Sequence, residues 1–352
     1  MELRYFTKPY ITMINRNQII SKLKNLIMVI FLCQFSSFSQ LTLDINKPKH
    51  SLASLAYGYL TAQNESLSYI ENKFPELQIE VMKARLSFST VFGRAEKRLS
   101  TYLKEYLGTT NFNTVKDCTL NQQLLDKYSN LVTQEIAKDF IFEVEQRAKG
   151  QIPSPILETI CAFNFKNNPV EEFSMGLIKK FNTKEHVKAN GVDLTISLPI
   201  SWKMVEGERP HVLHKFISDF GFGSEIVLLL IFDEKIPNLD KLSKEDLDAI
   251  YTEENFKKSI PSGARFISFT KSKIDNITTG IVELEMEFSE NEFPMKQRVI
   301  QHSFFCDGKT ILIQFSVNST EINEDLTVKL ANWQNLFKLI ANSVVVNSQW
   351  KK

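Results

Sequence analysis

Residues 192–202 have the sequence Val-Asp-Leu-Thr-Ile-Ser-Leu-Pro-Ile-Ser-Trp, and this stretch decides the fold class of the second half of the chain. Apolar residues stand at every second position from Val192 to Leu198, with polar residues between them. This period of two is typical of a strand with one buried face and one wetted face. Pro199 has no N–H to donate, so it ends the strand. The stretch therefore predicts the first strand of a β-rich half.

The residues that follow predict an antiparallel sheet with helices. Six further runs have strand-like composition: 211–218, 225–232, 265–271, 279–288, 297–306 and 310–317. Asp307-Gly308 favours a two-residue hairpin between the last two runs. Ser243 is typical of a helix N-cap, and apolar residues recur at helical steps in 326–342. Residues 344–346 are expected to return as a short edge strand. Together these patterns predict an α+β domain over residues 184–352.

The sequence of the first half of the chain predicts helices. Helical patterns occupy residues 66–107, with a break at Pro75, and residues 121–148. Within the first pattern, five apolar residues are expected to form the buried face: Ile79, Met82, Leu86, Val91 and Leu99. Two prolines at 153 and 155 turn the chain, and residues 156–165 and 170–181 predict two shorter helices. We therefore predict a helical domain over residues 40–183, packed as antiparallel helices.

Several carboxylates are expected to face water. Glu283, Glu285 and Glu287 alternate with apolar residues in 282–288 and predict the solvated side of a strand. Glu171 and Glu172 fall in a predicted helix and are interpreted as part of its solvated face.

The N-terminus predicts a secretory signal peptide over residues 1–39. Basic residues precede the apolar run 26–32, and Ser37-Phe38-Ser39 places small residues at the cleavage positions. Met13 is a candidate true start, and the mature chain is expected to begin at Gln40. A membrane anchor is the alternative, but the run is shorter than the roughly 20 residues a spanning helix needs. We expect a periplasmic or secreted protein without a transmembrane segment in its mature chain.

The charge balance argues against a nucleic-acid partner. Removal of residues 1–39 takes away five of 42 basic residues and one of 41 acidic residues, leaving 37 and 40, a net charge near −3. Such a surface offers no basic footprint for phosphates.

The cysteines permit one disulfide. Cys118 and Cys161 both fall in the helical half and are the natural pair in an exported chain. The alternative is that the cysteines are small buried hydrophobes. Three cysteines in the mature chain are too few and too dispersed for a zinc knuckle.

The order of elements suggests a resemblance. A strand ending in Pro199-Ile200-Ser201-Trp202, followed by sheet strands and a long C-terminal helix, resembles the PsbP-like α+β fold over about residues 185–350. The resemblance implies a non-catalytic binding or accessory protein. The helical half matches no family that we recognise.

The segment 202–211 is the candidate ligand- or partner-binding site. It is predicted to be a loop between strands and carries Trp202, Glu206, Arg209 and His211. The alternative is structural, with Trp202 capping the core and Arg209 pairing with an acid of the loop. His211 and His214 are three apart in a predicted strand and point to opposite faces, so we predict no metal site. No cofactor or catalytic motif is present; residues 221–223 lack the third glycine of a dinucleotide fingerprint.

These observations predict an exported, non-enzymatic accessory or binding protein of the bacterial cell envelope. One alternative is a carrier of a small apolar ligand or lipid in a cavity between sheet and helices. A hydrolase is a further alternative, and it requires His211, His214 or His302 within hydrogen-bond reach of a serine or carboxylate in a cleft.

Overall fold

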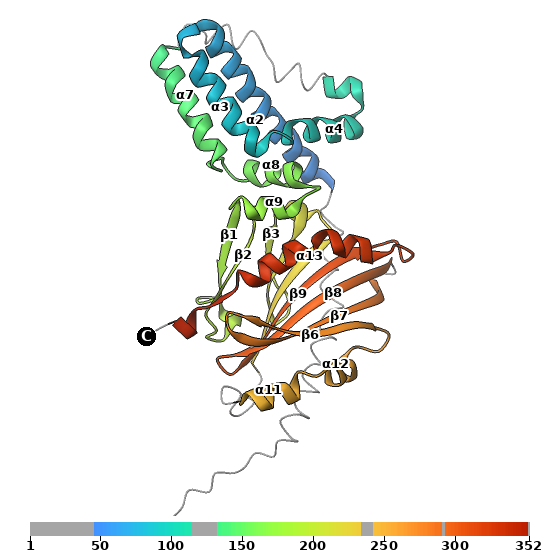
Figure 1. Cartoon of the computed structure of the whole chain (residues 1–352). Helices are drawn as coiled ribbons and strands as arrows, with labels where there is room; N and C mark the ends of the chain where they lie inside the picture. The colour runs from blue at the N-terminus through green and yellow to red at the C-terminus, as the bar shows by residue number, and fades with distance from the viewer. Residues whose placement is uncertain (1–45, 114–131, 234–241, 291–292, 351–352) are drawn as a thin grey trace, which may run out of the picture.

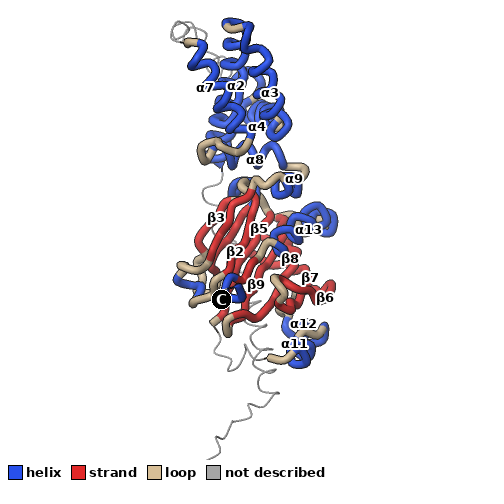
Figure 2. The backbone as a smooth tube through the Cα atoms, turned by 60° about the vertical axis from the view of Figure 1, so that its left-hand side comes forward, coloured by secondary structure: helices blue, strands red, loops and turns tan. Residues whose placement is uncertain are grey.

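The computed structural model describes residues 46–113, 132–233, 242–290 and 293–350. It has a helical half followed by antiparallel sheets flanked by helices, which confirms the predicted α+β class. Figures 1 and 2 show the two halves stacked end to end, with α8 (Ile156–Phe165) and α9 (Pro169–Ser174) between the long helices and the strands. The predicted signal peptide, Cys118 and the start of the predicted helix 121–148 lie outside the described residues.

The helical half consists of antiparallel helices around one apolar core. Its elements are α2 (Asn46–Lys73), the 3₁₀ turn η1 (Pro75–Leu77), α3 (Gln78–Phe92), α4 (Ala95–Leu107), α7 (Gln134–Ala148) and α8 (Ile156–Phe165). Pro75 interrupts the first helical run as expected. The Thr133 hydroxyl caps α7 by accepting from the Ile136 amide at 3.3 Å. α3 packs against α7, and α2 packs against α4 and α8.

The prediction of which face of α3 is buried is wrong. Its core residues are Val81, Ala84, Phe88 and Phe92, whereas three of the residues expected inside are exposed: Ile79 by 61%, Met82 by 62% and Leu86 by 66%. The helix has apolar side chains on two opposite faces, and a period of 3.6 fits either of them. The packing against α7 selects the second face and leaves the first in water.

The predicted helix 170–181 is also wrong in its second part. A short helix, α9 (Pro169–Ser174), ends before Gly176, which has a φ of 77°. The chain then forms the strand β1 (Ile178–Asn182), antiparallel to β2 (Leu194–Pro199), with Phe181 opposite Ile196. β2 is the strand predicted from residues 192–202. The expected edge strand is confirmed as β10 (Val345–Val346), on the other side of β2.

The other strands form one seven-stranded antiparallel sheet in the order β3-β4-β5-β9-β8-β7-β6. Their bounds are β3 (Lys203–Glu206), β4 (Val212–Ile217), β5 (Glu225–Phe232), β6 (Arg265–Ile274), β7 (Ile277–Glu290), β8 (Phe293–Cys306) and β9 (Lys309–Ser319). The predicted hairpin joins β8 to β9, with Asp307 and Gly308 at φ values of 50° and 71°.

Both faces of the large sheet are covered (Figure 1). α13 (Leu326–Asn342) and the three-stranded sheet contribute to the core on one face. On the other face, the core includes residues of α11 (Lys244–Ile250) and α12 (Glu253–Ser259). β5 is buried along its whole length because its alternate residues face these two layers. The predicted N-cap is confirmed as a capping box between Ser243 and Asp246.

The expected solvation of the β7 glutamates holds for Glu287 alone. The Glu283 and Glu285 side chains are only 18% and 13% exposed. Glu283 accepts from Arg298 Nε at 2.7 Å, and Glu285 accepts from Arg265 at 2.8 Å. Arg298 also donates to Thr327 of α13 at 2.5 Å. These carboxylates lie on the sheet face that α13 covers, so they are paired with cations there instead of being solvated.

Candidate functional site

The segment 202–211 is mostly a hairpin instead of a loop. Its residues 203–206 form β3, an edge strand paired with β4 in a register that places Glu206 opposite His214. Only residues 207–211 remain as the connection. The strand was not predicted because it is short and, as an edge strand, largely exposed.

Trp202 lies in the core. It is 1% exposed and packs edge-on against Trp333 of α13, with ring centroids 5.8 Å apart. Trp202 therefore has the structural role given above as the alternative, that of a side chain that caps the core. His211 stacks on Phe232 with centroids 4.6 Å apart, and Arg209 accepts at its carbonyl from the Val212 amide at 3.1 Å.

Glu206 is instead the centre of a cluster with His186, Lys188 and His214, which we call the Glu206 cluster. The Glu206 carboxylate accepts from His186 Nε2 at 3.3 Å and Lys188 Nζ at 3.2 Å, and His214 Nδ1 lies 3.8 Å away. A register shift between Val212 and His214 opposite β5 helps to set the side of the sheet on which His214 lies. His186 comes from the connection between β1 and β2, and sequence reasoning did not single it out.

Burial and hydrogen bonds shift the pKa values of Glu206 and His214. Desolvation acts to raise the pKa of Glu206, but the hydrogen bonds from His186 and Lys188 outweigh it and the pKa is lowered. Burial lowers the pKa of His214, and the Val205 carbonyl and Glu206 oppose this only in part. A carboxylate with a lowered pKa is a poor proton acceptor near neutral pH.

The ligand atoms of His186, Glu206 and His214 lie within 4.8 Å of one another, a separation that a divalent metal could bridge. The hydrogen bond of His186 opposes that use. His186 Nδ1 accepts from the Lys188 amide at 3.2 Å, which assigns the proton of the neutral ring to Nε2, the nitrogen that faces Glu206. His214 Nδ1 donates to the Val205 carbonyl at 3.3 Å, a bond that leaves the lone pair of the neutral ring on Nε2. The arrangement is a hydrogen-bonded ion cluster that ties β3 to the connection before β2.

Among the described residues, neither His214 Nδ1 nor His302 Nδ1 makes the hydrogen bond to a serine or carboxylate that a hydrolase requires. His214 Nδ1 is 3.8 Å from the carboxylate, beyond hydrogen-bond reach. His302 lies in the core beside Phe315, and burial lowers its pKa to about 4.

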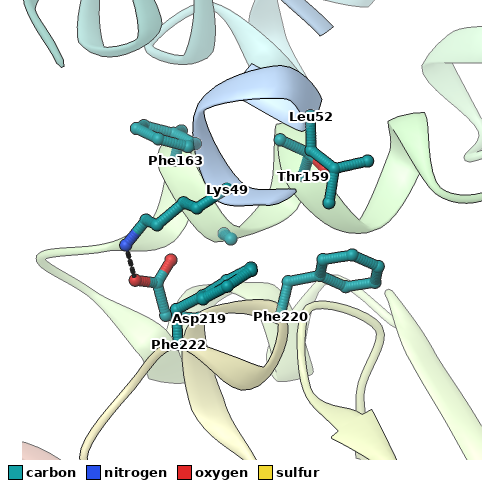
Figure 3. A pocket seen from close by; sticks show the side chains of 8 residues that line it. Lys49, Leu52, Thr159, Phe163, Asp219, Phe220 and Phe222 are labelled. Carbon is teal, nitrogen blue, oxygen red and sulfur yellow. Dashed lines mark hydrogen bonds and ion pairs between the residues drawn. The ribbon is translucent and has the colours of Figure 1, made fainter. Parts of the chain in front are cut away.

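A second group of side chains joins the two halves (Figure 3). Lys49 of α2 forms an ion pair with Asp219, and Leu52, Thr159 and Phe163 face Phe220 and Phe222 across a small pocket. Asp219 and Phe220 both have left-handed backbones, with φ values of 49° and 54°. Such strain persists where surrounding contacts hold it, and here the Phe220 amide donates to the Ser201 carbonyl at 2.7 Å.

A buried carboxylate lies at the same joint. Glu172 of α9 is 2% exposed and accepts from both the amide and the hydroxyl of Ser201 at 2.7 Å. Its prediction as a solvated residue is wrong, whereas Glu171 reaches Arg94 at 2.6 Å on the surface. Burial raises the pKa of Glu172 to about 7. Cys161 of α8 is a free, buried thiol; Cys118, its predicted disulfide partner, lies outside the described residues.

The helical half has a groove between α2 and α3 of about 390 Å³. Apolar side chains from both helices line it: Leu60, Leu67, Met82, Leu86, Phe88 and Phe92. Two of these, Met82 and Leu86, belong to the exposed face of α3. None of the described helices combines the length and apolar character needed to cross a bilayer.

Comparisons with known proteins give little similarity. No protein-family model and no curated protein matches the chain. Among solved structures, the chain is similar to LpqN of Mycobacterium tuberculosis, which is described as involved in cell envelope biogenesis. The sequence identity is 9% and the TM-score is 0.30, and the match covers 48% of this chain and 90% of LpqN. It is also similar to PA94 of Pseudomonas aeruginosa, a protein of unknown function described as a putative regulator, with 10% identity, coverages of 43% and 90%, and a TM-score of 0.22. These scores carry no functional argument. Neither is described as a PsbP protein, so that resemblance stays a prediction.

Proposed function

We propose that the chain is an exported, non-enzymatic binding protein of the bacterial cell envelope. In this proposal the sheet half is a rigid support, and the helical half displays the surface that binds a protein partner. The observation that carries the proposal is the exposed apolar face of α3, with three large side chains more than 60% exposed beside a groove. Contiguous exposed apolar surface of this kind is typical of interaction sites.

Two further observations support binding over catalysis or transport. The Glu206 cluster of the sheet half centres on a carboxylate with a lowered pKa that already accepts from His186 and Lys188. On the face of the sheet that α13 covers, large side chains fill the layer that an apolar carrier would need as a cavity: Trp202, Phe216, Phe315 and Phe337, each 0 or 1% exposed.

Cross-linking of the intact protein in the envelope of the cells that make it tests the proposal. We expect the protein in the exported fraction, with lysine cross-links to one reproducible protein partner near α3, at Lys83 and Lys97. Links concentrated at Lys188 and Lys203 would move the binding surface to the β3–β4 hairpin. Recovery in the cytoplasm, or a retained lipid in place of a protein partner, would contradict the proposal.

A further inference from the structure

We propose that the joint between the two halves is a pH-dependent hinge, which holds the halves in one orientation while Glu172 is protonated and lets them move when Glu172 is ionised. This inference concerns the chain alone, so it does not depend on the proposed function. The described helices α2 to α8 precede the joint, and α9 and the described strands follow it. α9 belongs with the sheet half, since Val170 and Phe173 pack against the core beneath α13.

Two ion pairs cross the joint at its surface. Lys49 of α2 pairs with Asp219, and Arg94 pairs with Glu171 of α9 at 2.6 Å. These side chains are between 23% and 46% exposed. Pairs exposed to this degree contribute little, because water competes for both charges. The docking of the halves therefore depends mainly on buried groups, among them the side chains that face each other in Figure 3.

Four titratable side chains lie together beside these contacts, and we call them the joint cluster. α8 contributes Glu158 and Cys161, α9 contributes Glu172, and β1 contributes Lys179. Burial is the main cause of the raised pKa of Cys161, and the charges of the other three members also act on it, so the four groups are close neighbours. The cluster draws its members from both halves, and its net charge therefore acts on the contact between them.

The cluster is neutral only while Glu172 carries its proton. Burial keeps the Cys161 thiol uncharged by raising its pKa, and Lys179 counterbalances Glu158. Ionisation of Glu172 adds a second negative charge beside Glu158, whose Oε2 atom is buried and accepts no hydrogen bond from the described residues. An excess charge held away from water is unfavourable. Ionisation therefore favours a state in which the joint opens and the cluster reaches water.

Within the described chain, the other elements that pack on α9 bring no further cation to Glu172. β2 has no charged residue in Leu194–Pro199. α13 has two: Lys329, which lies 3.8 Å from Glu225, and Lys338, which is exposed. The docked joint therefore stabilises the neutral acid.

The size of the effect follows from the pKa of Glu172, which burial raises from 4.5 to about 7. Opening of the joint returns the carboxyl group to water. The ratio of open to docked molecules therefore rises by up to ~10-fold per pH unit between these two values. It levels off at higher pH, after a total rise of up to ~300-fold.

A distance measurement between two spin labels in the purified full chain tests the inference. The labels are carried by unnatural amino acids at position 142 on α7 and position 273 on β6, which are exposed and lie one in each half. In double electron–electron resonance we expect one narrow distance distribution at pH 5 and a second, open population at pH 8. Circular dichroism is expected to show the same secondary structure at both pH values, which distinguishes opening of the joint from unfolding.

Glu172→Gln is the test variant, and Glu171→Gln is its matched control. Both remove one carboxylate from α9, but Glu171 pairs with Arg94 at the surface, whereas Glu172 accepts from the buried Ser201. Glu172→Gln is expected to keep the narrow distribution at pH 8, and Glu171→Gln is expected to open with pH as the wild type does.

The wild-type profile alone can overturn the inference. A distance distribution that is the same at pH 5 and pH 8 would do so without reference to any variant. Opening of Glu172→Gln with the pH dependence of the wild type would also overturn it, and so would a loss of opening in both variants.

Discussion

The substitution Glu172→Gln is expected to remove a pH dependence from the stability of the protein. Glu172 is buried at the joint between the halves, and its pKa is raised from 4.5 to about 7 because burial disfavours the carboxylate. The folded state therefore holds the proton more tightly than the unfolded state. Stability is fully present below pH 4.5, and it falls as the pH rises toward about 7.

The size of the effect follows from the difference between the two pKa values. About 2.5 pKa units correspond to about 3 kcal/mol of unfolding free energy. Glutamine stays neutral at every pH, and its carbonyl can still accept from the Ser201 amide, which now lies 2.7 Å from a carboxylate oxygen. We therefore expect the variant to match the wild type near pH 4 and to exceed it by up to about 3 kcal/mol at pH 8.

Urea unfolding of both proteins between pH 4 and pH 8 measures this difference. The reasoning is refuted if the difference between variant and wild type is the same at both ends of the range. It is also refuted if the variant is less stable at pH 8, since the ionised carboxylate would then be favourable in its site.

Three other predictions concern the sheet half and the joint. Trp202→Ala is expected to lower the unfolding free energy by about 3–5 kcal/mol because it opens a cavity beside Trp333; a loss below about 1 kcal/mol in urea unfolding would contradict its core position. Glu206→Gln is expected to lower the pKa of His214 further, because Glu206 raises it; an unchanged imidazole titration by NMR would contradict the electrostatic account of the cluster. A double-mutant cycle of Lys49→Ala and Asp219→Ala is expected to give a coupling of about 1 kcal/mol or less, since the two side chains are 23% and 30% exposed; a coupling of several kcal/mol would show that the pair acts as a buried one.

Apart from β3, the strands of the sheet half could be predicted because their patterns admit one solution. β5 occupies 225–232 as predicted, since an uninterrupted apolar run between turn residues suits a strand covered on both faces. α13 occupies 326–342 as predicted. Asp307-Gly308 forms the hairpin because both residues tolerate the left-handed backbone that a two-residue turn requires.

Other features depend on tertiary contacts that no local pattern encodes. α3 has two apolar faces, and only its packing on α7 decides which one is buried. Glu171 and Glu172 are adjacent and chemically equivalent in the sequence, yet one pairs with Arg94 on the surface and the other is buried against Ser201. Their difference comes from the docking of the two halves.

The candidate site was predicted only in part for the same reason. Glu206 was identified within 202–211, but its strongest partners, His186 and Lys188, come from about 20 residues earlier in the chain. Only the arrangement of the three-stranded sheet beside the seven-stranded sheet brings these residues together with Glu206. Trp202 was named in the same segment as a binding candidate, but it is buried against Trp333 of α13, a helix more than 100 residues away in the chain.

The most direct test of the account is a photo-reactive amino acid at position 82 in the full chain, irradiated in the cells that make the protein. The account predicts a cross-link to one protein partner at position 82 and no such product with the same group at position 142 on α7. Equal products at both positions, or cross-links only to lipid or to a second copy of this chain, would contradict it.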